Sequence, residues 1–190
     1  MINVRQVGPD DWNVYRDMRL EALQESPEAL GDRYGNEKNG TEQEWRNFVQ
    51  RCHRLVAYVD DLPAGTISVC QVTSGTAALT SLWVRPGARR HGVGDAIVNA
   101  ALALATASGY RDVQFCVEES SEAAIRLYCR KGFLPTGESM PIGLGNVSQA
   151  LGAKSALVSD AGRRRKARGW RRWSMKVRRN RCCILMTVGR

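Results

Sequence analysis

The segment best suited to bind a ligand is a basic, glycine-containing loop that leads from a strand into a helix. It reads RRHGVG at residues 89–94 and follows the apolar stretch LWV at residues 82–84. The N–H groups and the positive dipole end of a helix N-terminus favour an anion. Gly92 and Gly94 allow a close backbone approach that a Cβ would block. The loop therefore has the chemistry of a diphosphate cradle, although a plain turn from strand to helix would give a similar pattern.

This loop differs from the two best-known nucleotide-binding patterns. It lacks the G-K-[ST] ending of a P-loop, and it has only two of the three glycines of the dinucleotide motif G-x-G-x-x-G. A second segment begins 27 residues after Gly94 and reads SEAAIRLYCRKGF at residues 121–133. It predicts a helix that carries Tyr128, and a phenol with an ordinary pKa near 10 is a candidate proton donor.

Together these segments resemble the cofactor motifs of the GNAT N-acetyltransferase superfamily. Residues 89–94 match [QR]-x-x-G-x-[GA], residues 82–86 match the strand end L-x-V-x-P that precedes it, and residues 121–133 resemble N-x-x-A-x-x-x-Y-x-x-x-G-F. Residues 19–29 also resemble a common opening of these enzymes. The resemblance covers about residues 1–140. It implies an α/β (α+β) fold with a mixed, mostly antiparallel twisted sheet flanked by helices.

The resemblance implies an acetyl-CoA-dependent N-acyltransferase without a metal. The end of the strand would hold the pantetheine arm, and the loop would wrap the diphosphate with backbone N–H groups. Two positions depart from the family pattern: Ser121 replaces an Asn, and Asp95 replaces a frequent basic residue. The cofactor-binding residues expected from the match are Leu82, Trp83, Val84, Arg89, Arg90, His91, Gly92, Val93, Gly94, Asp95 and Ser121.

The resemblance assigns Tyr128 the role of general acid that protonates the leaving thiolate. The alternative is a tyrosine that simply packs on a helix face. The implied mechanism is direct attack of the amine on the thioester while a backbone N–H polarises the carbonyl oxygen, so no cysteine has a catalytic part.

The sequence does not identify the general base. Many relatives have a Glu on the strand before the second motif, where this chain has Cys116. The acidic candidates are each more typical of a solvated surface charge, and the two histidines of loop or surface residues. These candidates are Glu25, Glu118, Glu119, His53 and His91.

The pattern of apolar residues predicts alternating strands and helices around these motifs. Helices should begin at Asp10 or Asp11, at the Thr41–Glu44 capping box, at about Val93 and at Ser120 or Ser121, with Gly109 and Gly132 ending the last two. The predicted strands are residues 2–7, 55–59, 65–72, 77–84 and 113–117, and one that begins at Phe133.

The basic charge of the chain is confined to its last quarter. Residues 141–190 carry a net charge of +12 and residues 1–140 a net charge of −3. This Arg-rich tail allows three interpretations: a disordered extension that binds nucleic acid, a non-native reading frame, or a divergent closing strand. The predicted division is therefore a domain at residues 1–140 and a tail at residues 141–190.

The remaining features predict a cytoplasmic protein. There is no secretory signal and no stretch long enough to span a bilayer. The six cysteines lack C-x-x-C spacing, which favours reduced thiols over a disulfide framework or a metal site. The expected partners are acetyl-CoA and an amine acceptor, with a homodimer left open. The alternative function is nucleic-acid binding through the tail on a vestigial acyltransferase scaffold.

Overall fold

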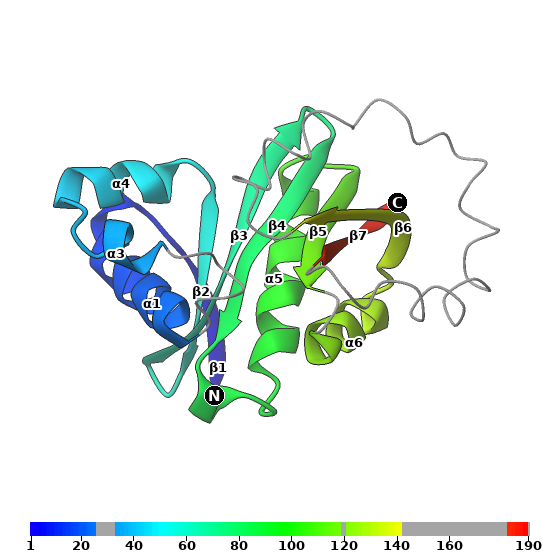
Figure 1. The fold of residues 1–190 in the computed structure, drawn as a ribbon. Coiled ribbons are helices and arrows are strands. Elements are labelled where there is room, and N and C mark those ends of the chain that lie inside the picture. The colour runs from blue at the N-terminus through cyan, green and yellow to red at the C-terminus, as the bar shows by residue number, and fades with distance from the viewer. Residues whose placement is uncertain (26–32, 119–120, 142–181, 190) are drawn as a thin grey trace. The chain divides into compact units, whose positions relative to one another are not determined.

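Many side chains of the N-terminal strands are buried, because helices cover both faces of the sheet that these strands form (Figure 1). The computed structural model describes residues 1–25, 33–118, 121–141 and 182–189. The chain divides into two units, residues 1–113 and residues 114–190, and each is described by itself. β5 (Asp112–Glu118) crosses the boundary between them.

The described residues of the first unit form antiparallel strands in the order β1-β2-β3-β4. All four predicted strands are present, and β3 is longer at both ends than expected. The β2–β3 hairpin turns through Asp60 and Asp61, which both have positive φ, of 49° and 62°. The strands are β1 (Ile2–Val7), β2 (His53–Val59), β3 (Leu62–Thr73) and β4 (Thr76–Val84).

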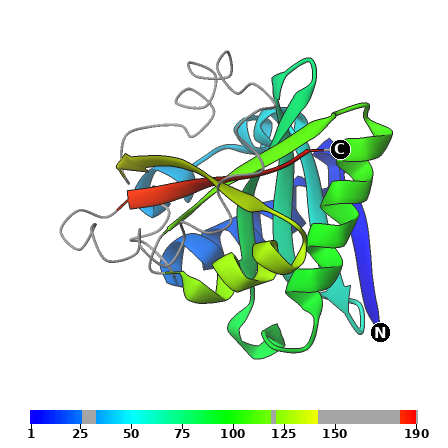
Figure 2. The ribbon, with the colours of Figure 1, turned by 90° about the vertical axis from the view of Figure 1, so that its right-hand side faces the viewer.

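The direction of side chains along β3 shows that α1 and α5 lie on opposite faces of this sheet. Ser68 contacts the hydroxyl of Tyr15 on α1 at 3.3 Å, whereas Gly65 lies against Val93 of α5. Residues an odd number of positions apart on a strand face opposite ways, so α1 and α5 cover different faces, as Figures 1 and 2 show. The helical elements are η1 (Pro9–Asp11), α1 (Trp12–Glu25), α3 (Tyr34–Glu37), α4 (Glu42–Gln50), η2 (Pro86–Ala88) and α5 (Val93–Ala107).

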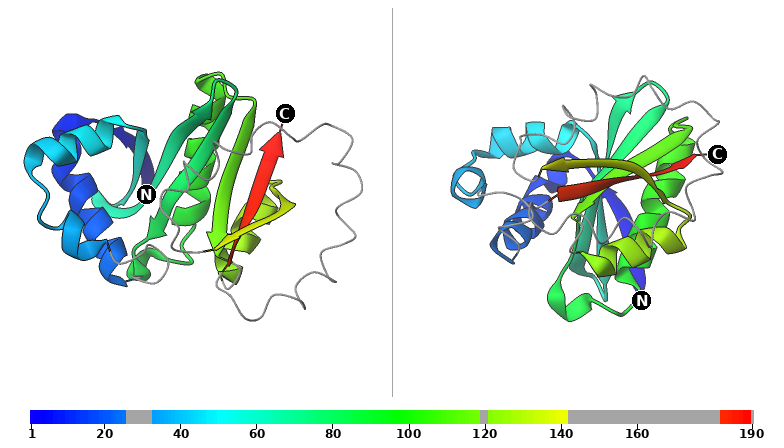
Figure 3. Two further views of the ribbon diagram at one scale, coloured as in Figure 1. Left: turned by 45° about the horizontal axis from the view of Figure 1, so that its top comes forward. Right: turned by 45° about the vertical axis from the view of Figure 1, so that its right-hand side comes forward.

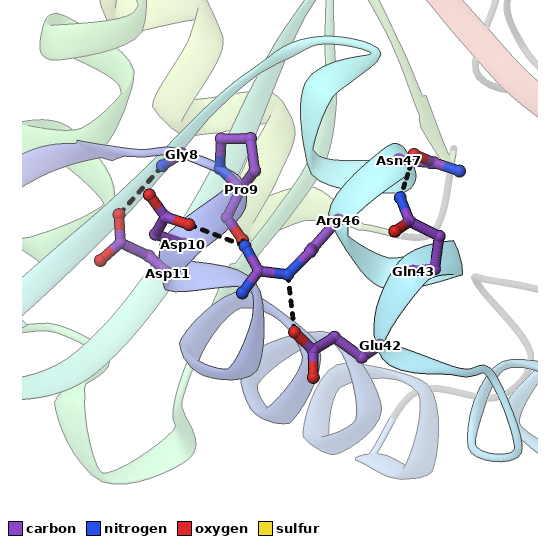
Figure 4. Close-up of polar contacts among 8 residues, drawn as sticks. All are labelled: Gly8, Pro9, Asp10, Asp11, Glu42, Gln43, Arg46 and Asn47. Atoms are coloured by element: carbon purple, nitrogen blue, oxygen red, sulfur yellow. Dashed lines mark hydrogen bonds and ion pairs between the residues drawn. The ribbon is translucent and has the colours of Figure 1, made fainter.

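Polar contacts of α4 fix its first turn and, through Arg46, tie the helix to the first helical turn of the chain (Figure 4). The capping box is confirmed, because Glu44 accepts the Thr41 N–H at 2.7 Å and donates its own N–H to the Thr41 hydroxyl at 3.3 Å. Arg46 bonds Asp10 and Glu42, both at 2.7 Å. α1 begins at Trp12, directly after the predicted cap residues Asp10 and Asp11, but the helical turn η1 precedes it. The turn begins earlier, with Gly8 as N-cap of η1, and the Asp11 carboxylate accepts the Gly8 N–H.

A cross-strand disulfide corrects the expectation that all cysteines are reduced. Cys52 and Cys70 are bonded, with their Cα atoms 4.7 Å apart. His53 on β2 pairs with Val69 on β3, so Cys52 and Cys70 stand at the next antiparallel position. Such a pair depends on the strand register, which the spacing of cysteines in the sequence does not reveal. The bond is also unusual for a cytosolic protein, and the cytoplasmic location stays a prediction.

Within its described residues, the second unit contains strands in the order β5-β7-β6 and a helix. The helix α6 (Glu122–Arg130) is followed by β6 (Leu134–Pro141), and β7 (Cys182–Gly189) pairs antiparallel with β6. Figure 3 shows β7 in red beside β6. One of the three interpretations of the tail placed a strand there. Residues 142–181, which hold most of its basic charge, lie outside the described residues.

None of the helices within the described ranges combines the length and apolar character needed to cross a membrane.

Candidate active site

A bulge in β4 lies where the predicted cofactor residues begin, and it includes Leu82. Ser68 pairs with Thr80 and Thr66 pairs with Trp83, so Ser81 and Leu82 stand opposite a single residue of β3. Ser81 has a φ of 55°. A bulge of this kind interrupts the ladder and redirects backbone groups. Sequence reasoning missed Ser81, because a serine inside an apolar strand gives no local signal of a bulge.

The predicted phosphate loop has a left-handed backbone at two positions. Arg90 has a φ of 66°, and Gly92, the N-cap of α5, has a φ of 84°. The first intrahelical bond runs from the Ala96 N–H to the Gly92 carbonyl at 3.0 Å. The N–H groups of Val93 and Gly94 therefore have no helical carbonyl to bond. A left-handed residue followed by a helical one makes successive N–H groups converge, which suits an anion.

The side chains of this loop differ in what they can offer a phosphate. Arg90 and His91 are exposed. Arg89 instead donates its Nε to the Val84 carbonyl at 2.9 Å and its Nη2 to Glu25 at 2.9 Å. Its guanidinium is thus directed at β4 and α1. The cofactor contact expected of Arg89 stays a prediction.

The end of β4 is held against α1 as well. Trp83 is 7% exposed and packs with Met18 and Ala22, and its indole Nε1 donates to Glu25 at 3.0 Å. Because Glu25 accepts from both Trp83 and Arg89, it is a poor candidate for the general base. Of the other candidates, His53 contacts Gln6 at 3.3 Å.

Tyr128 belongs to an aromatic cluster in the second unit. Its ring stacks on Phe115 with centroids 3.4 Å apart and meets Phe133 edge-on at 5.3 Å. The side chain is 3% exposed. Burial raises the pKa of the Tyr128 phenol well above its ordinary value, so the group stays protonated throughout the physiological range.

The end of α6 explains the Gly-Phe pair of the second motif. Gly132 has a φ of 85°, and the N–H groups of Gly132 and Phe133 bond the carbonyls of Cys129 and Tyr128 at 3.1 Å each. This is a Schellman C-cap, which favours glycine at the left-handed position. The cap returns Phe133 onto the Tyr128 ring. Gly109 ends α5 in the same way, with a φ of 83°, so both predicted helix ends are confirmed.

Ser121 lies at the start of the same helix. It is the N-cap of α6, but its side chain makes no capping hydrogen bond. The other base candidates of this region are less defined. Glu118 ends β5, Glu119 lies outside the described residues, and Cys116 is half-buried on β5.

Comparison with known proteins agrees with this arrangement of elements. The fold is similar to that of a GNAT-family acetyltransferase from Streptococcus pneumoniae, with a TM-score of 0.68 and 16% identity over 100% of this chain and 99% of that one. It is also similar to the PaiA N-acetyltransferase from Thermoplasma acidophilum in complex with coenzyme A, with a TM-score of 0.64 and 12% identity over 100% and 99% of the two chains. A GNAT-family acetyltransferase from Elizabethkingia anophelis with acetyl-CoA bound has a TM-score of 0.61 and 13% identity over 100% and 98%.

A search of curated proteins finds no match. The sequence itself matches the model of the acetyltransferase (GNAT) family over residues 15–133, which is more than half of the chain. The matched segment includes β4, the loop at residues 89–94, α5, α6 and Tyr128. The chain therefore belongs to the GNAT acetyltransferase family.

Proposed function

We propose that this protein transfers an acetyl group from acetyl-CoA to an amine. The observation that carries the proposal is the backbone of the loop before α5. Left-handed Gly92 and the N–H groups of Val93 and Gly94 form an anion-binding helix start, and they lie within the segment that matches the family. Two similar structures with coenzyme A or acetyl-CoA bound support the same ligand.

The proposed mechanism is direct transfer without a covalent enzyme intermediate. The neutral amine attacks the thioester carbonyl, a C–N bond forms, and the C–S bond breaks. The amine proton passes to solvent or to a base that is not yet assigned. Backbone N–H groups at the β4 bulge, around Ser81 and Leu82, are the proposed donors to the carbonyl oxygen. Such donors act by stabilising negative charge as it develops.

Tyr128 is the proposed acid for the departing thiolate. Burial keeps its phenol protonated, which is the form a general acid requires. The same burial reduces the driving force for giving up the proton, so positioning must supply part of the effect. After transfer, the phenolate regains its proton from solvent.

The acceptor is proposed to be a cationic amine, at the level of a class only. Residues 1–140 have a net charge of −3, which weakly favours a positively charged acceptor. Small polyamines, antibiotic amines, protein N-termini and lysine side chains all fit this description. A panel of such amines, assayed by release of the coenzyme A thiol, would identify the acceptor.

Titration calorimetry with coenzyme A tests the proposal. Binding by the wild type and its loss in Gly92→Glu would support it, because a glutamate there is strained at positive φ and repels phosphate. Gly35→Glu is the matched control, since a Cβ added at Gly35 meets nothing within 4 Å. A folded wild type that binds no coenzyme A, and binds nucleic acid with a steep salt dependence, would favour the tail-based alternative.

A further inference from the structure

Two arginines around the turn η2 are ion-paired with two glutamates of α1. Arg85 donates its Nε and Nη2 to Glu21 at 2.9 and 2.7 Å, and Arg89 donates its Nη2 to Glu25 at 2.9 Å. Glu21 and Glu25 are four residues apart and share one face of α1. The arginines are also four residues apart and flank the turn η2. The turn is therefore bonded to two successive helical turns of α1, once on each side.

Glu25 joins this turn to the strand before it. One carboxylate oxygen, Oε2, accepts from both the Trp83 indole and the Arg89 guanidinium, at 3.0 and 2.9 Å. Arg89 is also bonded to the Val84 carbonyl. The last residues of β4 and the first residue of the phosphate loop are therefore held by the same carboxylate at the end of α1.

We propose that Glu25 and Arg89 are positioning residues for coenzyme A binding. Through this pair, the end of α1 fixes the residues that follow Arg89, so that the N–H groups of Val93 and Gly94 are presented together to the diphosphate. The inference rests on the proposed function. It assigns Arg89 a different role from a direct phosphate contact, because the carboxylate already neutralises its charge.

The two roles of Arg89 predict opposite effects of removing Glu25. If Arg89 were a phosphate ligand restrained by Glu25, Glu25→Ala would release a cation and tighten coenzyme A binding. If the pair positions the loop, the same change loosens the loop and weakens binding. The direction of the change in Kd therefore separates the roles.

Calorimetry with coenzyme A on the folded variants measures this direction. We expect Glu25→Ala to raise Kd roughly tenfold, the loss typical of a charge-assisted hydrogen bond. Glu25→Gln keeps an acceptor oxygen and should raise it only about two- to threefold. In Glu25→Ala/Arg89→Ala, Kd should be no higher than in Glu25→Ala, since the two residues act as one unit.

The control removes an ion pair that touches no loop residue. Glu42→Ala breaks the Glu42–Arg46 pair of α4 and should leave Kd unchanged. Tighter or unchanged binding in Glu25→Ala and Glu25→Gln would overturn the positioning role, as would a lower melting temperature with an unchanged Kd. An absence of binding by the wild type would instead contradict the proposed function itself.

Discussion

Gly65 on β3 lies directly against Val93, the first residue of α5. A Cβ added to Gly65 would stand 3.3 Å from Cγ1 of Val93 and 3.0 Å from the carbonyl oxygen of Trp83. The sheet therefore approaches the start of the proposed phosphate site so closely that a Cβ at Gly65 would have to push its neighbours aside.

Gly65→Ala should weaken coenzyme A binding and lower stability. The added methyl must displace Val93 or the β4 backbone, and overpacking of this kind costs about 1–3 kcal/mol. Chemical denaturation and calorimetry measure the two effects. Gly75→Ala is the control, because its Cβ would meet only the Arg111 guanidinium, at 3.2 Å, which can move aside. Equal effects of the two substitutions would contradict the argument.

Tyr128→Phe tests the proposed general acid. We expect kcat to fall roughly 100-fold or more, the usual contribution of a positioned acid, while coenzyme A affinity stays nearly unchanged. Because burial raises the pKa of Tyr128, deprotonation of this phenol should not reduce the wild-type rate between pH 8 and about 10. An unaltered kcat in the variant would remove Tyr128 from the mechanism.

The disulfide predicts a stability that depends on redox conditions. Reduction of Cys52–Cys70, or Cys52→Ser/Cys70→Ser, should lower the free energy of unfolding by about 3 kcal/mol, because the bond closes a loop with a sequence separation of 18. Denaturation with and without a dithiol reductant measures this difference. The double serine variant should show no response to the reductant. If the wild type also shows none, the bond is not present in solution.

The features that the sequence predicted well depend on neighbouring residues. The Thr41–Glu44 capping box and the C-caps at Gly109 and Gly132 each need only residues within one turn of the chain. The start of α5 after Gly92 was predicted for the same reason, since the glycines of the loop precede a helix directly. The diphosphate that this loop would bind stays a prediction. The fold was predicted from the resemblance of these local motifs to those of a known family.

The features that were missed depend on how distant segments align. The bulge at Ser81 and the Cys52–Cys70 bond both follow from strand register. The pairs Glu21–Arg85 and Glu25–Arg89 join residues 64 apart. Their equal spacing of four in both segments was the available signal, but only knowledge that α1 lies beside β4 would have given it meaning.

Asp61→Gly should stabilise the β2–β3 hairpin. Asp61 has a φ of 62°, and two-residue hairpin turns of this left-handed type prefer glycine at the second position. The left-handed conformation costs a residue with a Cβ about 1–2 kcal/mol, and it costs an aspartate somewhat less. Removing the Cβ relieves this strain. The loss is the Arg5–Asp61 ion pair, with side chains 52% and 90% exposed, and exposed pairs contribute about 0–1 kcal/mol. Relief of strain should therefore exceed the lost pair, and the free energy of unfolding should rise.

Asp61→Ala separates the two contributions, because it removes the carboxylate and keeps the Cβ at positive φ. Denaturation should rank the proteins Gly variant, wild type, Ala variant in decreasing stability, and a Gly variant no more stable than the Ala variant would show that backbone strain at Asp61 is negligible.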